Sequence, residues 1–121
     1  IYIAKSKIGL ELYKNKNIPK IVTDNNNKLL YISRASIPSN KLGKFEKAYG
    51  QINIYSFPRK YLFLKKFKNK KTFNEKIEDI EILRFLERGI DVKVVLMKKP
   101  TQPVDVSQDL IKVKNILLKK K

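Results

Sequence analysis

Two short apolar runs that flank a turn-forming tetrapeptide constrain the fold more than any other feature of the sequence. The runs are KIVT at 20–23 and KLLYISR at 28–34, and DNNN at 24–27 separates them. β-Branched residues favour strands, whereas Asn and Asp tolerate the backbone of tight turns. The pattern predicts a β-hairpin, and we therefore expect a sheet with antiparallel pairing.

Strands and helices are predicted to alternate along the rest of the chain. Residues 1–4 predict a short strand followed by a basic loop, and 51–57 predict a buried strand. Residues 90–97 predict an internal strand, because that run is apolar on both faces. Residues 35–50 are rich in turn formers and predict a long excursion.

Three helices are predicted between and after these strands. The first, 59–68, follows Pro58, a residue that suits the first helical turn. The second is 73–88, and the third begins near Ser107, a plausible N-cap after which apolar residues recur at helical spacing. This order of elements predicts an α/β layer fold with a mixed sheet.

The chain is large enough for one compact domain and too small for two. It has 121 residues, of which 42% are hydrophobic, and such a chain builds a single core. No apolar stretch approaches the roughly 20 residues that cross a bilayer, so no membrane span is expected. The first residues do not resemble a signal peptide, and the start at Ile1 leads us to expect a fragment.

The sequence contains no Cys and no His. Disulfides, thiol nucleophiles, histidine bases and the usual zinc sites are therefore excluded. Any metal must be bound by oxygen ligands, which favours Mg²⁺ or Ca²⁺. A chain without cysteine fits a cytoplasmic location, and we expect one.

The net charge of +17 first suggests a nucleic acid or another anionic surface as the partner. Two observations weaken that interpretation. Lys, Asn and Ile are all frequent, as an AT-rich genome would produce, and the lysines are spread along the chain instead of clustering among aromatic residues. We expect no nucleic-acid partner and keep a basic binding module as the non-enzymatic alternative.

The segment EKIEDIEILRFLERG at 75–89 gathers four carboxylates into its first seven positions, although the chain around it is basic. Thr72 and Glu75 have the spacing of a capping box, and Gly89 is a natural stop. We therefore expect one continuous helix over 73–88, roughly 24 Å long. Its apolar residues surround the axis, which predicts burial on most sides.

Three charged residues of this predicted helix form a candidate site. Glu78, Glu81 and Arg84 follow one another at i, i+3 and i+6, so they share one side of the helix. Glu81 and Arg84 can pair, which leaves two interpretations, a structural ion pair or a ligand pocket. Asp79 is interpreted as an ordinary surface charge.

Asp105, in PVDVSQDL, is a candidate metal ligand. It lies just before a helix and near the end of a strand, where ligands bind in open α/β sheets. An aspartate at this position is also a common helix cap. Ser107 can supply the cap instead, which frees Asp105 for a metal ion.

Four segments of the chain, in this order, resemble the second half of the CMP-Kdo synthetases, the 3-deoxy-manno-octulosonate cytidylyltransferases. They are NIPKIVTDNNNKLLYISRASIP, QINIYSF, EKIEDIEILRFLERGIDVKVV and PVDVSQDLIKV, and they extend over residues 17–113. The resemblance implies a Rossmann-like, three-layer α/β nucleotide-diphospho-sugar transferase fold. Residues 1–121 would form its C-terminal part, with a mixed sheet, in a homodimer.

The resemblance also implies an activity and a cofactor. Members of the family transfer CMP from CTP to the sugar acid Kdo for lipopolysaccharide biosynthesis. The anomeric hydroxyl of the sugar attacks the α-phosphate and pyrophosphate leaves, while Mg²⁺ neutralises the phosphates. This chemistry depends on placement and charge stabilisation, so a chain without His or Cys can take part in it.

By motif position, the resemblance assigns roles to single residues. Asp105 falls on the family's C-terminal metal ligand, and Glu81 falls on the acidic residue that faces the sugar. Tyr55 falls on a tyrosine near the sugar carboxylate. Ser33 and Arg34 match the FSR motif that borders the sugar pocket.

The remaining assignments include two departures from the family. Arg84 matches the family's LR dipeptide and would support Glu81, with Glu78 beside it. Gln51 stands where better-known members have His, and Ile82 stands where they often have Gln. Gln51 can hydrogen-bond but cannot titrate, and Ile82 cannot hydrogen-bond at all. These departures make a cytidylyltransferase for 8-amino-Kdo, or for another nonulosonic acid, the alternative.

Two motifs of the family's N-terminal half are absent from this sequence. They are the loop that binds the CTP phosphates and the QGDEP motif with the other metal-binding aspartate. We therefore expect the 121 residues to hold part of the sugar site and to be inactive by themselves. A non-catalytic oligomerisation module derived from the family is a further alternative.

Overall fold

The computed structural model describes residues 1–63, 70–98, 104 and 107–118. The strands are β1 (Tyr2–Ile8), β2 (Lys20–Thr23), β3 (Leu29–Ser33), β4 (Ala48–Ser56) and β5 (Lys93–Leu96). The helices are α1 (Leu10–Lys14), α2 (Arg59–Phe63), α4 (Phe73–Glu78), α5 (Leu83–Leu86) and α6 (Ser107–Leu118). Among these helices, none is long and apolar enough to cross a membrane.

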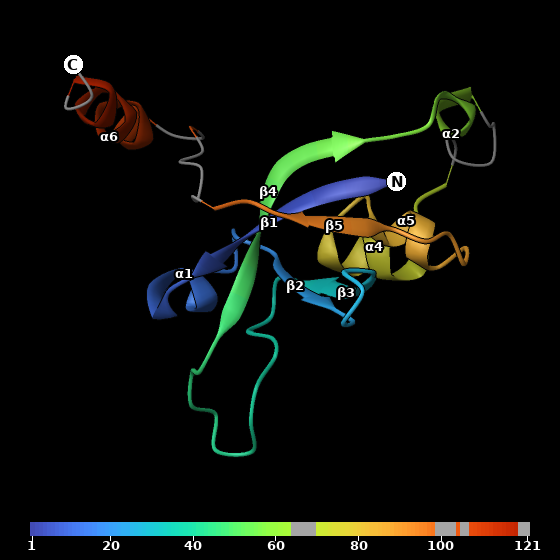
Figure 1. The fold of residues 1–121 in the computed structure, drawn as a ribbon, viewed down its shortest axis with the longest axis horizontal. Coiled ribbons are helices and arrows are strands. Elements are labelled where there is room, and N and C mark those ends of the chain that lie inside the picture. Colours follow the sequence, from blue (N-terminus) through green and yellow to red (C-terminus); the bar gives the residue numbers. More distant parts are fainter. Residues whose placement is uncertain (64–69, 99–103, 105–106, 119–121) are drawn as a thin grey trace.

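The strands form one mixed sheet in the order β3-β2-β4-β1-β5 (Figure 1). β4 is antiparallel to β1 and β2, whereas β5 is parallel to β1. β2 and β3 form the predicted hairpin, with Lys20 opposite Ser33. The α/β class, the mixed sheet and the hairpin are thus confirmed.

The sheet curls, so that its two edges approach each other. The backbone nitrogen of Leu29 donates to the carbonyl of Val92 at 2.8 Å, and that of Val94 donates to the carbonyl of Asn27 at 2.8 Å. These hydrogen bonds join the start of β3 to β5, although the two strands lie at opposite ends of the strand order. The hairpin therefore folds back across the sheet.

The main core lies between the curled sheet and the helix pair α4–α5. The helical segment contributes four buried side chains, Ile80, Ile82, Leu83 and Phe85. The strands and their flanks contribute Ile3, Ile21, Leu29, Ile32, Val92 and Val94. A smaller cluster of Ile8, Tyr13 and Ala48 lies beside α1. The burial predicted for the segment 73–88 is therefore confirmed for residues 80–86 and wrong for its first part, where Ile77 is 68% exposed.

Three strands differ from the prediction. β1 continues through residues 5–8 instead of ending in a basic loop, because these residues pair with β4. β4 begins at Ala48 and is buried only in its first half, since Ile54 is 55% exposed. β5 lies at an edge of the sheet, with Val94 in the core and Leu96 exposed, so the prediction of an internal strand is wrong for the described chain.

The predicted continuous helix over 73–88 is also wrong, because the chain breaks into α4 and α5. Asp79 adopts a left-handed conformation, with φ 51°, and ends α4. Aspartate visits this region more readily than most residues, since its short side chain bonds locally. The expected terminal features are present: Thr72 and Glu75 form the capping box, and Gly89 has φ 69°.

The remaining predicted helices agree with the structure where it describes them. α2 begins directly after Pro58 and accounts for 59–63 of the predicted helix 59–68, and 64–69 lie outside the described residues. α6 begins at Ser107, as predicted, and none of its described side chains is buried. The excursion between β3 and β4 is present and contains a cis peptide bond before Pro38.

Replacing Gly50 with alanine is predicted to destabilise the sheet. A Cβ at this position would lie 2.9 Å from Cγ2 of Ile8 and 3.0 Å from Cγ2 of Ile18. Overpacking of this kind costs about 1–3 kcal/mol in the free energy of unfolding, which urea denaturation would measure. Gly9→Ala is the matched control, because a Cβ there meets no atom within 4 Å. Equal stability of the two variants would contradict the prediction.

Candidate functional site

The carboxylate of Glu78 joins the end of α4 to the end of β3. One oxygen accepts a hydrogen bond from Oγ of Ser33 at 2.5 Å, and the other accepts one from the backbone nitrogen of Arg34 at 2.9 Å. Three predicted site residues therefore lie together, although 44 residues separate Arg34 from Glu78. Charge-assisted hydrogen bonds of this kind are stronger than neutral ones, so the junction fixes α4 against the sheet edge.

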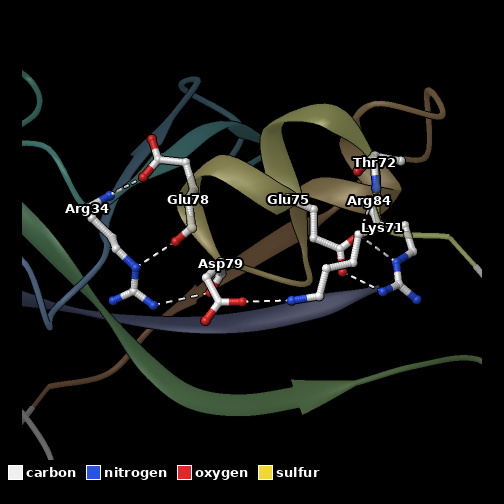
Figure 2. A network of polar contacts seen from close by, with 7 residues as sticks. All are labelled: Arg34, Lys71, Thr72, Glu75, Glu78, Asp79 and Arg84. Atoms are coloured by element: carbon white, nitrogen blue, oxygen red, sulfur yellow. Dashed lines mark hydrogen bonds and ion pairs between the residues drawn. The ribbon is translucent and has the colours of Figure 1, made fainter.

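The guanidinium group of Arg34 adds hydrogen bonds to backbone carbonyls at the end of α4 (Figure 2). Its Nε donates to the carbonyl of Glu78 at 2.6 Å, and one Nη donates to the carbonyl of Asp79 at 3.1 Å. The other Nη donates to the carbonyl of Lys16 at 3.1 Å. A cation that binds the last carbonyls of a helix also interacts favourably with the helix dipole. These contacts give Arg34 a structural role at the end of α4.

Lys20 contacts the same junction, and it was not among the predicted site residues. Its side chain is fully buried, and its Nζ donates to the carbonyls of Arg34 at 2.6 Å and Asn15 at 3.0 Å. Burial lowers the pKa of Lys20, while the nearby carboxylate of Glu78 raises it. Lysine side chains are mostly exposed, and nothing in KIVT indicates that this one is buried.

Asp79 carries an exposed carboxylate, as predicted, but its backbone has a structural role. The carboxylate pairs with Lys71 at 2.8 Å on the surface, and the hydrogen bond from Lys71 lowers the pKa of Asp79. Exposed pairs of this kind contribute little to stability. The left-handed backbone of Asp79 instead ends α4 and turns the chain toward Glu81 and α5.

Arg84 pairs with Glu75, not with Glu81. Its Nε donates to one oxygen of Glu75 at 2.8 Å, and its Nη2 contacts the other (Figure 2). The side chain of Glu75 is 1% exposed, and it also accepts a hydrogen bond from the backbone nitrogen of Thr72 at 3.1 Å. The expected Glu81–Arg84 pair assumed a continuous helix, and the break at Asp79 changes which residues face each other.

The ion pair also determines the protonation of Glu75. Burial alone would raise the pKa of this carboxyl group, but hydrogen bonds from Arg84 and Thr72 lower it overall. Arg84 has its pKa raised in return, chiefly by the hydrogen bond to Glu75. Glu75 is therefore ionised at neutral pH and forms part of the framework between α4 and α5.

A second group of predicted site residues lies on β4, where Gln51 is partly buried and Tyr55 belongs to the exposed half. The amide nitrogen of Gln51 donates to the phenol oxygen of Tyr55. Burial raises the pKa of Tyr55, the hydrogen bond from Gln51 lowers it, and the nearby Glu81 carboxylate raises it again, so that the shift is upward. Tyr55 keeps its proton at neutral pH and can donate it in a hydrogen bond. Glu81 itself is exposed.

The predicted site residues thus fall into three groups. Ser33, Arg34 and Glu78 form a junction in which they bind one another. Gln51 and Tyr55 form an exposed polar pair, with Glu81 close enough to act on Tyr55 electrostatically. Arg84 is paired with Glu75. Among these predicted site residues, Tyr55 and Glu81 are exposed, Ser33 is buried, and the others are partly buried.

Two positions that the sequence analysis identified remain, Asp105 and Ile82. Asp105, the predicted metal ligand, lies outside the described residues. Within the described residues, no three acidic side chains lie close enough together to hold a metal ion. Ile82 is fully buried in the core, so its replacement of the family's Gln affects packing and does not remove a polar group from an exposed surface here.

Comparisons with known proteins confirm the resemblance. The chain is 38% identical, over 118 residues, to a 3-deoxy-manno-octulosonate cytidylyltransferase of Chloroherpeton thalassium, with 91% of this chain and 45% of that protein covered. It is 36% identical, over 101 residues, to an 8-amino-3,8-dideoxy-manno-octulosonate cytidylyltransferase of Shewanella pealeana, with 78% and 38% covered. No family model matches the chain. The chain therefore spans less than half the length of these relatives.

A solved structure confirms the fold class. It is that of a CMP:2-keto-3-deoxy-manno-octonic acid synthetase in complex with CTP, with a TM-score of 0.87 and 22% sequence identity. The match covers 99% of this chain and 49% of that one. The chain thus shares the α/β fold of about half of that enzyme.

Removing Arg84 is predicted to destabilise the chain in a pH-dependent way. Arg84→Met leaves a buried carboxylate without its cation, which costs about 3–5 kcal/mol in the free energy of unfolding at pH 7. In the unsubstituted chain, the lowered pKa of Glu75 contributes stability at pH values above 4.5, the ordinary pKa of this carboxyl group. That contribution is lost as the pH falls through the lower folded-state pKa.

Urea denaturation of both proteins at pH 7 and pH 3 would test this expectation. The difference between the two stabilities should be smaller at pH 3, because Glu75 is then protonated in the variant and its unpaired charge disappears. A difference that stays constant between the two pH values would show that Arg84 stabilises the fold by packing alone.

Glu78→Gln is predicted to cost about 1–3 kcal/mol in the free energy of unfolding, because one of the two donors at the β3 end loses its acceptor. Glu81→Gln is the matched control, with an expected change within about 0.5 kcal/mol for an exposed position. Denaturation of both variants in urea measures the difference. The structural role assigned to Glu78 is wrong if the two variants are equally stable.

Proposed function

We propose that this chain is part of a 3-deoxy-manno-octulosonate cytidylyltransferase and contributes to the site for its sugar acid. The observation that carries the proposal is the similarity in sequence to such enzymes over 91% of the chain. The proposed reaction transfers CMP from CTP to the anomeric hydroxyl of the sugar. A bond forms between that oxygen and the α-phosphorus, the bond to pyrophosphate breaks, and the hydroxyl proton is lost.

Gln51, Tyr55 and Glu81 are proposed to bind the sugar acid. The phenol of Tyr55 is protonated at neutral pH, because its pKa is raised chiefly by burial, and it can donate to the sugar carboxylate. Gln51 holds the phenol oxygen by its own hydrogen bond and so limits the orientations of the ring. The exposed carboxylate of Glu81 can accept hydrogen bonds from sugar hydroxyls.

Ser33, Arg34, Glu78 and Arg84 are proposed to act on the sugar site indirectly. Glu78 and Arg34 fix the end of α4, and Arg84 connects α5 to Glu75. Glu81 lies between these two fixed points, in the segment that follows Asp79. Restricting this segment reduces the conformational freedom that sugar binding must otherwise remove.

The same proposal includes Mg²⁺ as the metal, a homodimer as the assembly and the cytoplasm as the location. Mg²⁺ would supply charge neutralisation at the phosphates, and Asp105 is the ligand that this chain would provide. A homodimer and a cytoplasmic location follow the pattern of the family. A sugar acid with an 8-amino group is the second candidate substrate, and the 36% identity to an enzyme named for that sugar supports it.

Sugar binding by the 121-residue chain is the first test of the proposal. Calorimetric titration with Kdo should show binding that Tyr55→Phe and Glu81→Gln each weaken by about tenfold, the effect of losing one good hydrogen bond. Glu11→Gln, an exposed position in α1, is the control and should bind as the unsubstituted chain does. Titration with 8-amino-Kdo identifies the preferred sugar. Equal binding by all variants would exclude these residues from the site.

Turnover by the same chain is the second test. The chain spans 45% of the relative from Chloroherpeton thalassium, so we propose that the 121 residues alone do not complete the reaction. Incubation with CTP, Kdo and Mg²⁺ should yield no CMP-Kdo. Formation of CMP-Kdo under these conditions would contradict this part of the proposal while supporting the assigned activity.

A further inference from the structure

A buried lysine on β1 has no role in the sugar site described above. Lys5 is only 4% exposed. Its Nζ donates to Oγ1 of Thr23 at 2.8 Å and lies 4.5 Å from the centre of the Tyr49 ring. β4 lies between β1 and β2 in the strand order, so the Lys5–Thr23 contact depends on the curl of the sheet.

A second lysine lies beside the same ring. The Nζ of Lys47 is 5.4 Å from the centre of the Tyr49 ring. Burial lowers the pKa of Lys5, Tyr49 raises it in part, and the positive charge of Lys47 lowers it further. A hydroxyl group and an aromatic face compensate a buried ammonium only in part. Among the described residues, none of the ion pairs includes Lys5 or Lys47. Two neighbouring cations therefore lack a carboxylate partner.

A surface cavity lies directly over this group. Its volume is about 220 Å³, and it is lined by Ile21, Val22, Thr23, Pro38, Lys47 and Tyr49. Both side chains that contact the Lys5 ammonium, Thr23 and Tyr49, are part of the wall. The wall of the cavity thus includes an exposed lysine and a hydroxyl group, and that hydroxyl group accepts a hydrogen bond from the buried ammonium of Lys5.

We propose that this cavity binds a small oxyanion of the phosphate class, contacted by Lys47 and Thr23 and attracted by the charge of Lys5. At neutral pH a phosphate monoester carries a charge of about −1.5 to −2, which matches two ammonium groups. Its unprotonated oxygens accept hydrogen bonds from Lys47 and from the Thr23 hydroxyl. Partial burial reduces screening by water and salt, which strengthens the attraction.

This site is distinct from the proposed sugar site. None of the residues that line the cavity belongs to the Gln51, Tyr55 and Glu81 group. The two proposals can therefore fail independently: loss of Kdo binding would leave phosphate binding intact, and the reverse also holds.

Titration of the 121-residue chain with inorganic phosphate, at constant ionic strength, tests the inference. Amide chemical shifts of Thr23 and Tyr49 should saturate with phosphate and respond much less to acetate. Lys47→Gln changes an exposed side chain and should weaken phosphate binding by about tenfold or more, as expected for losing one charge-assisted contact. Lys5→Met should weaken it similarly, and because methionine suits a buried position this variant should remain folded.

The control is Lys14→Gln, which removes one positive charge at an exposed position on α1. It should bind phosphate as the unsubstituted chain does. Equal weakening in Lys14→Gln and Lys47→Gln would mean that phosphate responds only to the net charge of the chain, and would overturn the inference. Acetate binding as tight as phosphate binding would overturn the assignment to the phosphate class.

Discussion

The hydrogen bonds between Glu78 and the end of β3 are the interaction on which the rest of the structure depends. They join residues that are 45 and 44 positions apart in the sequence, and they fix the end of α4 on the sheet. The guanidinium group of Arg34 also donates hydrogen bonds to the carbonyls of Glu78 and Asp79. With α4 held in this way, the chain turns at Asp79, and Ile80 and Ile82 enter the core.

The scarce acids of this basic chain lie together mainly because they stabilise the fold. Glu75 holds Arg84, Glu78 holds the end of β3, and Asp79 contacts Lys71. Buried or partly buried carboxylates need such partners, since desolvation otherwise disfavours the charged form. Glu81 differs from them because it is exposed and its carboxylate takes part in none of the hydrogen bonds or ion pairs of the described residues. That difference is what makes it the strongest candidate in this stretch for contact with a ligand.

Local patterns predicted the elements that depend on neighbouring residues. The hairpin at 20–33, the capping box at Thr72 and the stop at Gly89 each follow from backbone preferences or from a hydrogen bond within one turn. The break at Asp79 could not be predicted in this way. Its left-handed backbone is stabilised by contacts from Arg34 and Lys71, of which the former is distant in sequence.

The sequence by itself determined the α/β class, the hairpin and the family resemblance, because these follow from local preferences and from the order of motifs. Only the tertiary structure decided which charges meet. Helical spacing paired Arg84 with Glu81, whereas the turn at Asp79 placed it on Glu75. The curl of the sheet likewise brought Lys5 to Thr23 across β4. Both contacts depend on chain segments that approach each other only after the core has packed, which no local pattern records.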